Sequence, residues 1–334
     1  MLRLAPVSIL GTAAVMLLSG CGIVGGASAT RTPTPTETAT ASPTATATST
    51  PTATPTPEPT ATPVPRSAVA DDPVASDGLT LGQGRTAIVR WPAGGAATAS
   101  LTFRGLRLPM LHDEGDFWLP IGVGPDTPVG AYALTIVTAD GAGNAVESRT
   151  VTVNVVATDF PVEEIDVPPS QDNLLSPDEV QKELNIRAEV FARFTPEKLW
   201  SGPFILPVSG PVTSPFGISR SYNGAPVSSH HSGTDFGVAE GTPVMAAASG
   251  RVAFAGALTT RGNSVIIDHG LGVFTAYHHL SRIDVAEGQA IAQGQVLGAA
   301  GMTGLATGPH LHWELIVMGQ NVDPTIWTYA GVAP

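Results

Sequence analysis

Short apolar runs, separated by glycine, proline and aspartate, recur along the chain after residue 77. Between residues 78 and 156, four segments alternate apolar with polar residues or run apolar over the length of a strand: Thr86–Trp91, Ala99–Phe103, Tyr132–Thr138 and Thr150–Val156. Short strands at such regular spacing are typical of a β-sandwich. We therefore predict a small antiparallel β-sandwich for residues 78–156.

Glycine also punctuates short strand-like runs in the last part of the chain, residues 203–334. The runs that read as β are Pro243–Ala248, Gly250–Ala255, Ser264–Asp268, Val273–Tyr277 and His310–Val317. No long helical pattern interrupts them. An all-β domain of two packed sheets is the simplest architecture for this pattern.

Residues 157–202, between the two β regions, carry the helical signals. The run Ser176–Glu179 offers a capping serine, a proline for the first turn and a glutamate that completes a capping box. Three apolar residues then lie roughly on one face and predict a helix to about residue 193: Val180, Leu184 and Phe191. Thr195–Glu197 indicates a second, short start. We expect this connector to pack between the two β domains.

The first 20 residues predict export. A basic Arg3 precedes an apolar run from Leu4 to Leu18, which is too short for a comfortable membrane span and ends in small residues. Leu18-Ser19-Gly20-Cys21 resembles the bacterial lipoprotein signal, in which cleavage precedes a cysteine whose thiol is then lipidated. The alternative is an ordinary signal peptide with an incidental cysteine. Because Cys21 is the single cysteine of the chain, we favour a lipid anchor there.

Residues 21–77 form the predicted linker. Within it, residues 31–65 consist almost entirely of threonine, proline and alanine and have no apolar periodicity. Such a composition predicts a disordered, extended stalk that adds reach or serves as a passive spacer. The net charge of −12 makes binding to nucleic acid through its phosphates unfavourable, so we expect no nucleic-acid partner.

The chemistry concentrates in the last domain, where seven of the eight histidines lie between His230 and His312. Because side chains alternate along a strand, His310 and His312 face the same side, and Glu314 joins them if the strand is regular. His231 and Asp235 are four residues apart, but the intervening Ser-Gly-Thr is a poor helix interior, so a strand or loop is favoured. Two imidazoles and a carboxylate are a catalytic zinc set, and further histidines remain for proton transfer.

The ordered motifs of this domain resemble those of the lysostaphin/LytM-type zinc metallopeptidases. The similarity runs from about Val212 to Asp323. The matching segments are His231–Asp235, Gly241–Ala246, Gly250–Val252, Gly262–Gly270, Thr275–Ser281, Gly288–Gly294 and Thr303–Glu314. The strand pattern of residues 78–156 separately resembles bacterial immunoglobulin-like domains. We interpret that first domain as a spacer or a wall-contacting module.

The resemblance assigns roles to individual residues. It implies His231, Asp235 and His312 as zinc ligands, and His279 and His310 as the catalytic histidines. The family's Tyr-x-His-Leu motif matches residues 277–280, which places His278 at the variable position, although a one-residue shift would exchange the two. Neighbours on a strand face opposite sides, so only one of them reaches the groove. By the same argument, His230 should face away from the metal.

Several residues near the motifs keep two interpretations. We read His269 as structural at a strand end and His112 as part of a surface loop. Glu314 is either a water-activating base or, as we favour, a group that holds the ligands in place. Tyr222 could donate a hydrogen bond to an oxyanion.

The resemblance implies hydrolysis of the stem or bridge peptides of bacterial peptidoglycan by a zinc-activated water. The expected location is the outer face of a bacterial membrane, lipid-anchored and facing the cell wall. One alternative is a non-hydrolytic peptidoglycan-binding or regulatory module that activates wall amidases; missing ligands mark that class, and none is missing here. A purely structural zinc site needs four ligands, and only three match.

Overall fold

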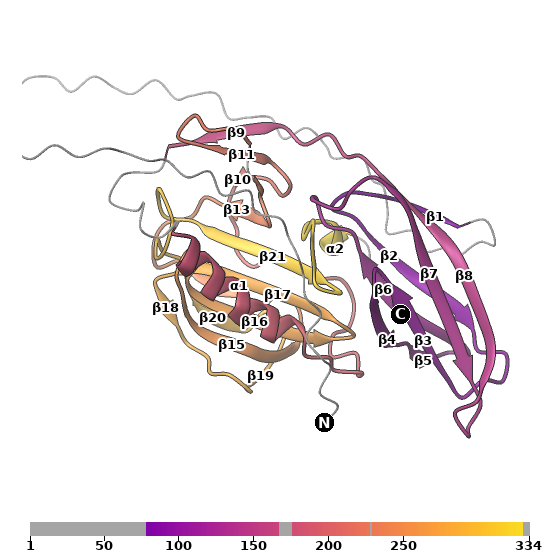
Figure 1. The fold of residues 1–334 in the computed structure, drawn as a ribbon. Helices are drawn as coiled ribbons and strands as arrows, with labels where there is room; N and C mark the ends of the chain where they lie inside the picture. The colour runs from indigo at the N-terminus through magenta and orange to yellow at the C-terminus, as the bar shows by residue number, and fades with distance from the viewer. Residues whose placement is uncertain (1–77, 167–175, 228, 330–334) are drawn as a thin grey trace, which may run out of the picture. The chain divides into compact units, whose positions relative to one another are not determined.

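The computed structural model describes residues 78–166, 176–227 and 229–329. The predicted signal peptide, Cys21 and the predicted linker lie outside these residues. The described chain is mainly β, as the apolar pattern predicts (Figure 1). None of the helices within these ranges combines the length and apolar character that a membrane span requires.

The first lobe consists of two β-sheets over a common core (Figure 1). The five-stranded sheet has the order β1-β8-β7-β3-β4: β1 (Leu79–Gly82), β3 (Thr98–Phe103), β4 (Leu106–Pro109), β7 (Gly130–Ala139) and β8 (Ala145–Val156). The other has the order β2-β6-β5: β2 (Thr86–Pro92), β5 (Leu111–Asp113) and β6 (Asp116–Gly122).

Alternation along β3 accounts for its place in the sheet. It buries Ala99, Leu101 and Phe103 and leaves the residues between them more exposed. Two details differ from the sequence prediction. Strand β1 pairs in parallel with β8, so the sandwich is not wholly antiparallel. His112 is exposed as expected, but it lies on β5 rather than in a loop.

The connector contributes one strand and one helix, β9 (Val162–Ile165) and α1 (Pro177–Phe191). Strand β9 pairs in parallel with β11 of the last domain. Helix α1 lies on the large sheet of that domain, with Val190 in a small apolar cluster that includes Phe274 and Ile316 (Figure 1). The helix therefore packs on one face of the last domain, and the expectation that the connector lies between the two β domains was wrong for this helix.

The details of α1 also depart from the prediction. Ser176 occupies the cap position, but its side chain makes no capping hydrogen bond. Leu184, expected on the packed face, is 49% exposed. The buried positions are instead Glu183, Arg187 and Val190. No helix forms at residues 195–197, where a second start was expected.

The last domain is built on one large sheet and two small ones. The large sheet has the order β10-β13-β21-β17-β16-β15-β19, with β22 beside β21: β10 (Val212–Ser214), β13 (Thr234–Phe236), β15 (Gly250–Leu258), β16 (Gly262–Gly270), β17 (Val273–Leu280), β19 (Ala290–Ile291), β21 (Leu311–Val317) and β22 (Gln320–Val322). The small sheets have the orders β12-β11-β9 and β14-β20-β18: β11 (Ser219–Tyr222), β12 (Ser229–His230), β14 (Pro243–Met245), β18 (Arg282–Ile283) and β20 (Val296–Ala299).

The register of three central strands places the chemistry-bearing residues together. Strand β13 runs antiparallel to β21, with Asp235 opposite His312. Strand β17 runs antiparallel to the other edge of β21, with His278 opposite His312. Residues separated by more than 70 positions in the sequence therefore meet at one end of the sheet.

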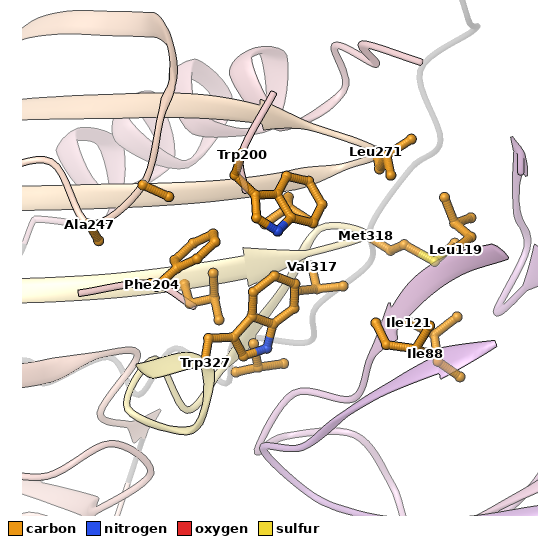
Figure 2. Close-up of a cluster of buried hydrophobic side chains, with 14 of the residues drawn as sticks. Ile88, Leu119, Ile121, Trp200, Phe204, Ala247, Leu271, Val317, Met318 and Trp327 are labelled. Carbon is orange, nitrogen blue, oxygen red and sulfur yellow. The ribbon is translucent and has the colours of Figure 1, made fainter. Parts of the chain in front are cut away.

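A buried aromatic cluster joins the two lobes (Figure 2). Trp327, on α2 (Ile326–Tyr329), lies against Trp200 and Phe204, with ring centroids 6.1 and 5.2 Å away. Its indole N–H donates a hydrogen bond to the hydroxyl of Thr86 on β2 at 3.1 Å. Ile88 of the first lobe belongs to the same cluster (Figure 2). The lobes thus share buried apolar surface.

Truncation of this cluster should destabilise the protein strongly. We expect Trp327→Ala to lower the free energy of unfolding by about 3–5 kcal/mol, because a wholly buried aromatic side chain is lost. Leu184→Ala, at a half-exposed helix position, should change it by only about 0.5 kcal/mol. Urea denaturation of both variants measures the difference, and equal losses would contradict the role of the cluster.

Candidate metal centre

Three side chains converge on one point beside β21. His231 follows β12, Asp235 lies on β13 and His312 lies on β21. The Nε2 atom of His231 is 3.0 Å from Oδ1 of Asp235 and 2.9 Å from Nδ1 of His312. That Nδ1 is 2.6 Å from the same carboxylate oxygen. The structure thus brings together the three residues that the sequence predicts as metal ligands.

Each imidazole is oriented by its second nitrogen. Nδ1 of His231 donates to the carbonyl oxygen of Pro215 at 2.9 Å, and Nε2 of His312 donates to Oε1 of Glu314 at 3.1 Å. Hydrogen bonds of this kind fix the ring and leave the other nitrogen as an acceptor. Two imidazole nitrogens and the carboxylate of Asp235 therefore face one another.

The electrostatics of this point favour a cation. Burial lowers the pKa of His231, so its ring is neutral, which is the form that binds metal. Burial also acts to lower the pKa of His312, but Asp235 and Glu314 outweigh it and the pKa is raised. His312 therefore tends to hold a proton when no metal is bound. Two imidazoles and one carboxylate are donors that Zn²⁺ accepts, so these residues fit a zinc ion that replaces the proton.

A glycine makes the close approach of the His231 turn possible. A Cβ atom on Gly233 would lie 2.3 Å from the carbonyl oxygen of Trp313 and 2.9 Å from Cε1 of His312. No side chain fits at that distance. Residues 231–233 form neither helix nor strand and Thr234 begins β13, which agrees with the expected strand or loop in place of a helix.

Two further histidines stand beside the converging donors. His279 is the last residue but one of β17, and His310 immediately precedes β21; their ring centroids are 4.6 Å apart. Nδ1 of His279 donates to the carbonyl oxygen of Thr303 at 2.7 Å, and Nδ1 of His310 donates to that of Gly308 at 2.8 Å. Both rings therefore keep Nε2 available for proton transfer.

The backbone conformation at His279 helps to explain why the neighbouring His278 and His279 side chains lie in different surroundings. His279 has a φ of +60°, in the left-handed region that non-glycine residues seldom adopt. His278, one residue earlier, is wholly buried and its Nδ1 lies 2.7 Å from the Ser264 hydroxyl. His279, in contrast, lines a cavity. Of the doublet, it is therefore His279 that reaches the open space, as the alternation argument expects.

That cavity has a volume of about 390 Å³, within the range of small-ligand pockets. Asp235, His279, His310 and His312 line one part of it. Other parts of its wall come from the connector, with Ile165 and Val180, and from strands β11 and β12, with Tyr222 and His230. The convergent donors are therefore open to a ligand on one side.

The other histidines have local partners. His269 is wholly buried, with Nδ1 2.8 Å from the Ser249 carbonyl oxygen, and burial lowers its pKa to about 4. Burial likewise lowers the pKa of His278 to about 3. Nδ1 of His230 lies 2.6 Å from a carboxylate oxygen of Asp126 in the first lobe. His230 is not turned wholly away, because it also lines the cavity.

Glu314 lies behind His312 and has no exposed surface. Its Oε1 accepts hydrogen bonds from His312 and from the Ser232 hydroxyl, the latter at 2.7 Å. It is absent from the residues that line the cavity. This geometry fits a group that orients a ligand better than a base that activates water.

Sequence reasoning missed the arginines around the site. Arg220 donates to Oδ2 of Asp235 at 3.1 Å and so holds the carboxylate from its outer side. Arg261 and Arg187 both pair with Glu314. An isolated arginine in a sequence normally marks a solvated surface, so no local signal distinguishes these three.

Comparison with known proteins agrees with this arrangement. Residues 229–324 match Peptidase family M23. Peptidoglycan DD-endopeptidase ShyA of Vibrio cholerae is 47% identical over 93 residues, which cover 28% of this chain and 22% of that protein. The crystal structure of a Pseudomonas aeruginosa protein described as a peptidase M23 has a TM-score of 0.57 at 29% identity, covering 74% of this chain and 94% of that chain.

The catalytic domain of lysostaphin from Staphylococcus simulans is 28% identical, with a TM-score of 0.29, over 39% of this chain and 93% of that domain.

The β-fold and the three donors beside an open cavity define a domain of the metallopeptidase class. More particularly, the last domain of this chain is a Peptidase family M23 domain, which confirms the resemblance seen in the sequence. The chain spans less than a quarter of the length of ShyA.

Gly233 offers a direct test of the site geometry. We expect Gly233→Ala to destabilise the fold by about 1–3 kcal/mol and to reduce bound metal, because the added methyl group must displace Trp313 or His312. Gly141→Ala, where the added atom meets open space, is the matched control. Thermal unfolding and metal analysis measure both effects; normal metal content in Gly233→Ala would contradict the close packing.

Proposed function

We propose that the protein is a zinc endopeptidase that hydrolyses peptide cross-links of bacterial peptidoglycan while anchored to a membrane. The observation that carries the proposal is the convergence of His231, Asp235 and His312 beside a cavity that His279 and His310 also line. A catalytic zinc site has three protein ligands and one open position. A structural zinc site would need a fourth ligand, and no fourth protein donor joins this group within the described residues.

The residues around the cavity have separate tasks in this proposal. Zn²⁺, when bound, supplies a water molecule of lowered pKa and polarises a carbonyl group. His279 and His310 present Nε2 to the cavity, where each can accept the proton of the attacking water or pass one to the leaving amine. Burial holds the pKa of His279 well below its ordinary value, so its ring is neutral and ready to accept a proton. Tyr222 lines the same cavity and is a candidate donor to the oxyanion.

The substrate follows from the cavity and the relatives. ShyA is named a peptidoglycan DD-endopeptidase, and its similarity to this chain falls on the domain that holds the site. We propose the same class of bond, between D-amino acids of the stem peptides, as the substrate. A cavity of this size accepts an extended peptide rather than a folded protein.

A regulatory role is the second candidate. The cell division protein DipM of Caulobacter vibrioides is 36% identical over 115 residues, and its name describes division rather than hydrolysis. Loss of ligands would mark a module that only binds or activates, whereas this chain keeps every donor and both further histidines. The catalytic proposal is therefore favoured.

Two pairs of variants separate metal binding from catalysis. His279→Ala and His310→Ala should lower the rate of hydrolysis by about a hundredfold or more and leave zinc bound, because each removes a proton-transfer group. Asp235→Ala and His312→Ala should lose the zinc itself. The measurements are zinc content and the release of new amino termini from purified peptidoglycan. Wild-type hydrolysis by His310→Ala, or zinc-free hydrolysis by the parent protein, would refute the assignment.

Anchoring is a separate part of the proposal and has its own test. Leu18-Ser19-Gly20-Cys21 supports lipidation of Cys21, and the threonine- and proline-rich residues 31–65 would then give the enzyme reach. We expect Cys21→Ser to move the protein from the membrane fraction to the soluble exported fraction, with hydrolysis by the purified protein unchanged. Cell fractionation measures this. Membrane retention of Cys21→Ser after a salt and carbonate wash would contradict the lipid anchor.

A further inference from the structure

Helix α1 packs with charged side chains where an ordinary surface helix would pack with apolar ones. Glu183 and Arg187 are 2% and 6% exposed, whereas Leu184 and Ile186 are 49% and 39% exposed. Burial of a charge is unfavourable unless the charge is paired. The partners of these two residues therefore explain why the helix is turned this way.

Both residues join a group of four charges, of which three are buried and the fourth, Arg261, has a side chain 20% exposed. Arg187 donates to Oε2 of Glu314 at 2.5 Å. Arg261 donates to Oε1 of Glu314 at 3.0 Å and to Oε1 of Glu183 at 2.6 Å. Two carboxylates thus face two guanidinium groups, and the formal charge of the group sums to zero. The connector supplies one member of each sign.

The group ends at a proposed zinc ligand. Oε1 of Glu314 accepts the Nε2–H of His312 at 3.1 Å, and this hydrogen bond leaves Nδ1 of His312 facing Asp235. Arg187 donates to the other carboxylate oxygen, Oε2, and so helps to fix the orientation in which Oε1 faces His312.

Stability alone is a weak reason for such a group. Buried ion pairs are often no more stabilising than apolar residues of the same volume. The C-terminal end of α1 packs on the same sheet through apolar residues, because Val190 lies in a cluster with Phe274 and Ile316. The helix can therefore pack on this sheet without buried charges. Removal of one member, however, leaves an uncompensated charge beside His312.

We propose that Arg187, on the connector helix, is a positioning residue for the zinc site, which it serves by holding the Glu314 carboxylate in the orientation that accepts the Nε2–H of His312. This inference rests on the proposed zinc site. The match to the family covers residues 229–324, so Arg187 lies outside it. The inference therefore gives a residue of the connector a role in the metal site of the last domain. Arg187 does not line the cavity, and its hydrogen bond in this group is to Glu314.

The test uses the full-length chain and three variants of one helix. Arg187→Met removes the charge and keeps much of the volume, and Arg187→Lys keeps the charge. Lys182→Met is the matched control, because Lys182 lies on the same helix and pairs with Glu179 at the surface. Zinc affinity is measured by competition with a chromophoric chelator. Thermal unfolding of the zinc-free proteins and separate kcat and KM values on a cross-linked peptide accompany it.

We expect Arg187→Met to raise the zinc dissociation constant by about tenfold, the lower end of the range for partners of metal ligands. Its kcat should fall with KM little changed, because the peptide-binding surface is intact. Arg187→Lys should recover most of the affinity, and Lys182→Met should match the parent protein. If Arg187→Met does not fold, Arg187→Gln replaces it with the same expectation.

The outcomes distinguish the inference from the function on which it rests. Unaltered zinc affinity in a folded, less stable Arg187→Met protein would show a merely structural role and overturn the inference. An equal loss in Lys182→Met would overturn it as well. If the parent protein binds no zinc, the proposed function fails and the inference fails with it.

Discussion

The antiparallel pairing of β13 with β21 is the constraint on which the site depends. It sets Asp235 directly opposite His312, and the short turn before β13 returns His231 to the same point. Three donor atoms then lie within 3.0 Å of one another. A sheet is a rigid scaffold, so the donors are placed before any ligand arrives. Gly233 is the residue whose lack of a side chain makes the approach possible.

Around this pairing, hydrogen bonds orient each functional ring. The Pro215 and Glu314 oxygens hold the two proposed ligand histidines, and the Thr303 and Gly308 carbonyls hold His279 and His310. The nitrogen that is not used in these hydrogen bonds, Nε2 in His231, His279 and His310 and Nδ1 in His312, therefore stays available at the proposed metal site or the adjoining cavity. Such orientation by a second layer of partners is what makes a metal site or a proton-transfer site efficient. The charged face of α1 extends this layer beyond the domain itself.

The sequence predicts some of these features because their signals are local. Alternation in β3 buries Leu101 and exposes its neighbours, so the strand is readable without the fold. The His-Leu-His run at residues 310–312 and the ordered motifs around it identify the donors. His310 is an exception to simple strand alternation, because it lies just outside β21 and forms an isolated β-bridge with Gly301.

Other features depend on tertiary contacts that no local pattern encodes. From the sequence, Glu183 and Arg187 look like solvated residues of a helix and Leu184 looks like a buried one. In the structure the two charged residues are buried and Leu184 is exposed. The reason is that Arg187 donates a hydrogen bond to Glu314 and Glu183 accepts one from Arg261. The Ser176 capping box is absent although its residues are present. Glu179 of that box pairs with Lys182 and with Thr259, so tertiary and side-chain partners replaced the local one.

The proposed site binds one zinc ion through two imidazoles and one carboxylate and keeps a fourth position open. X-ray absorption at the zinc edge of the purified full-length protein reports these ligands. We expect four light ligands at about 2.0–2.1 Å, with multiple scattering from two imidazoles and no sulfur. A zinc-free protein, or a zinc ion surrounded by four protein ligands, would contradict the proposed site.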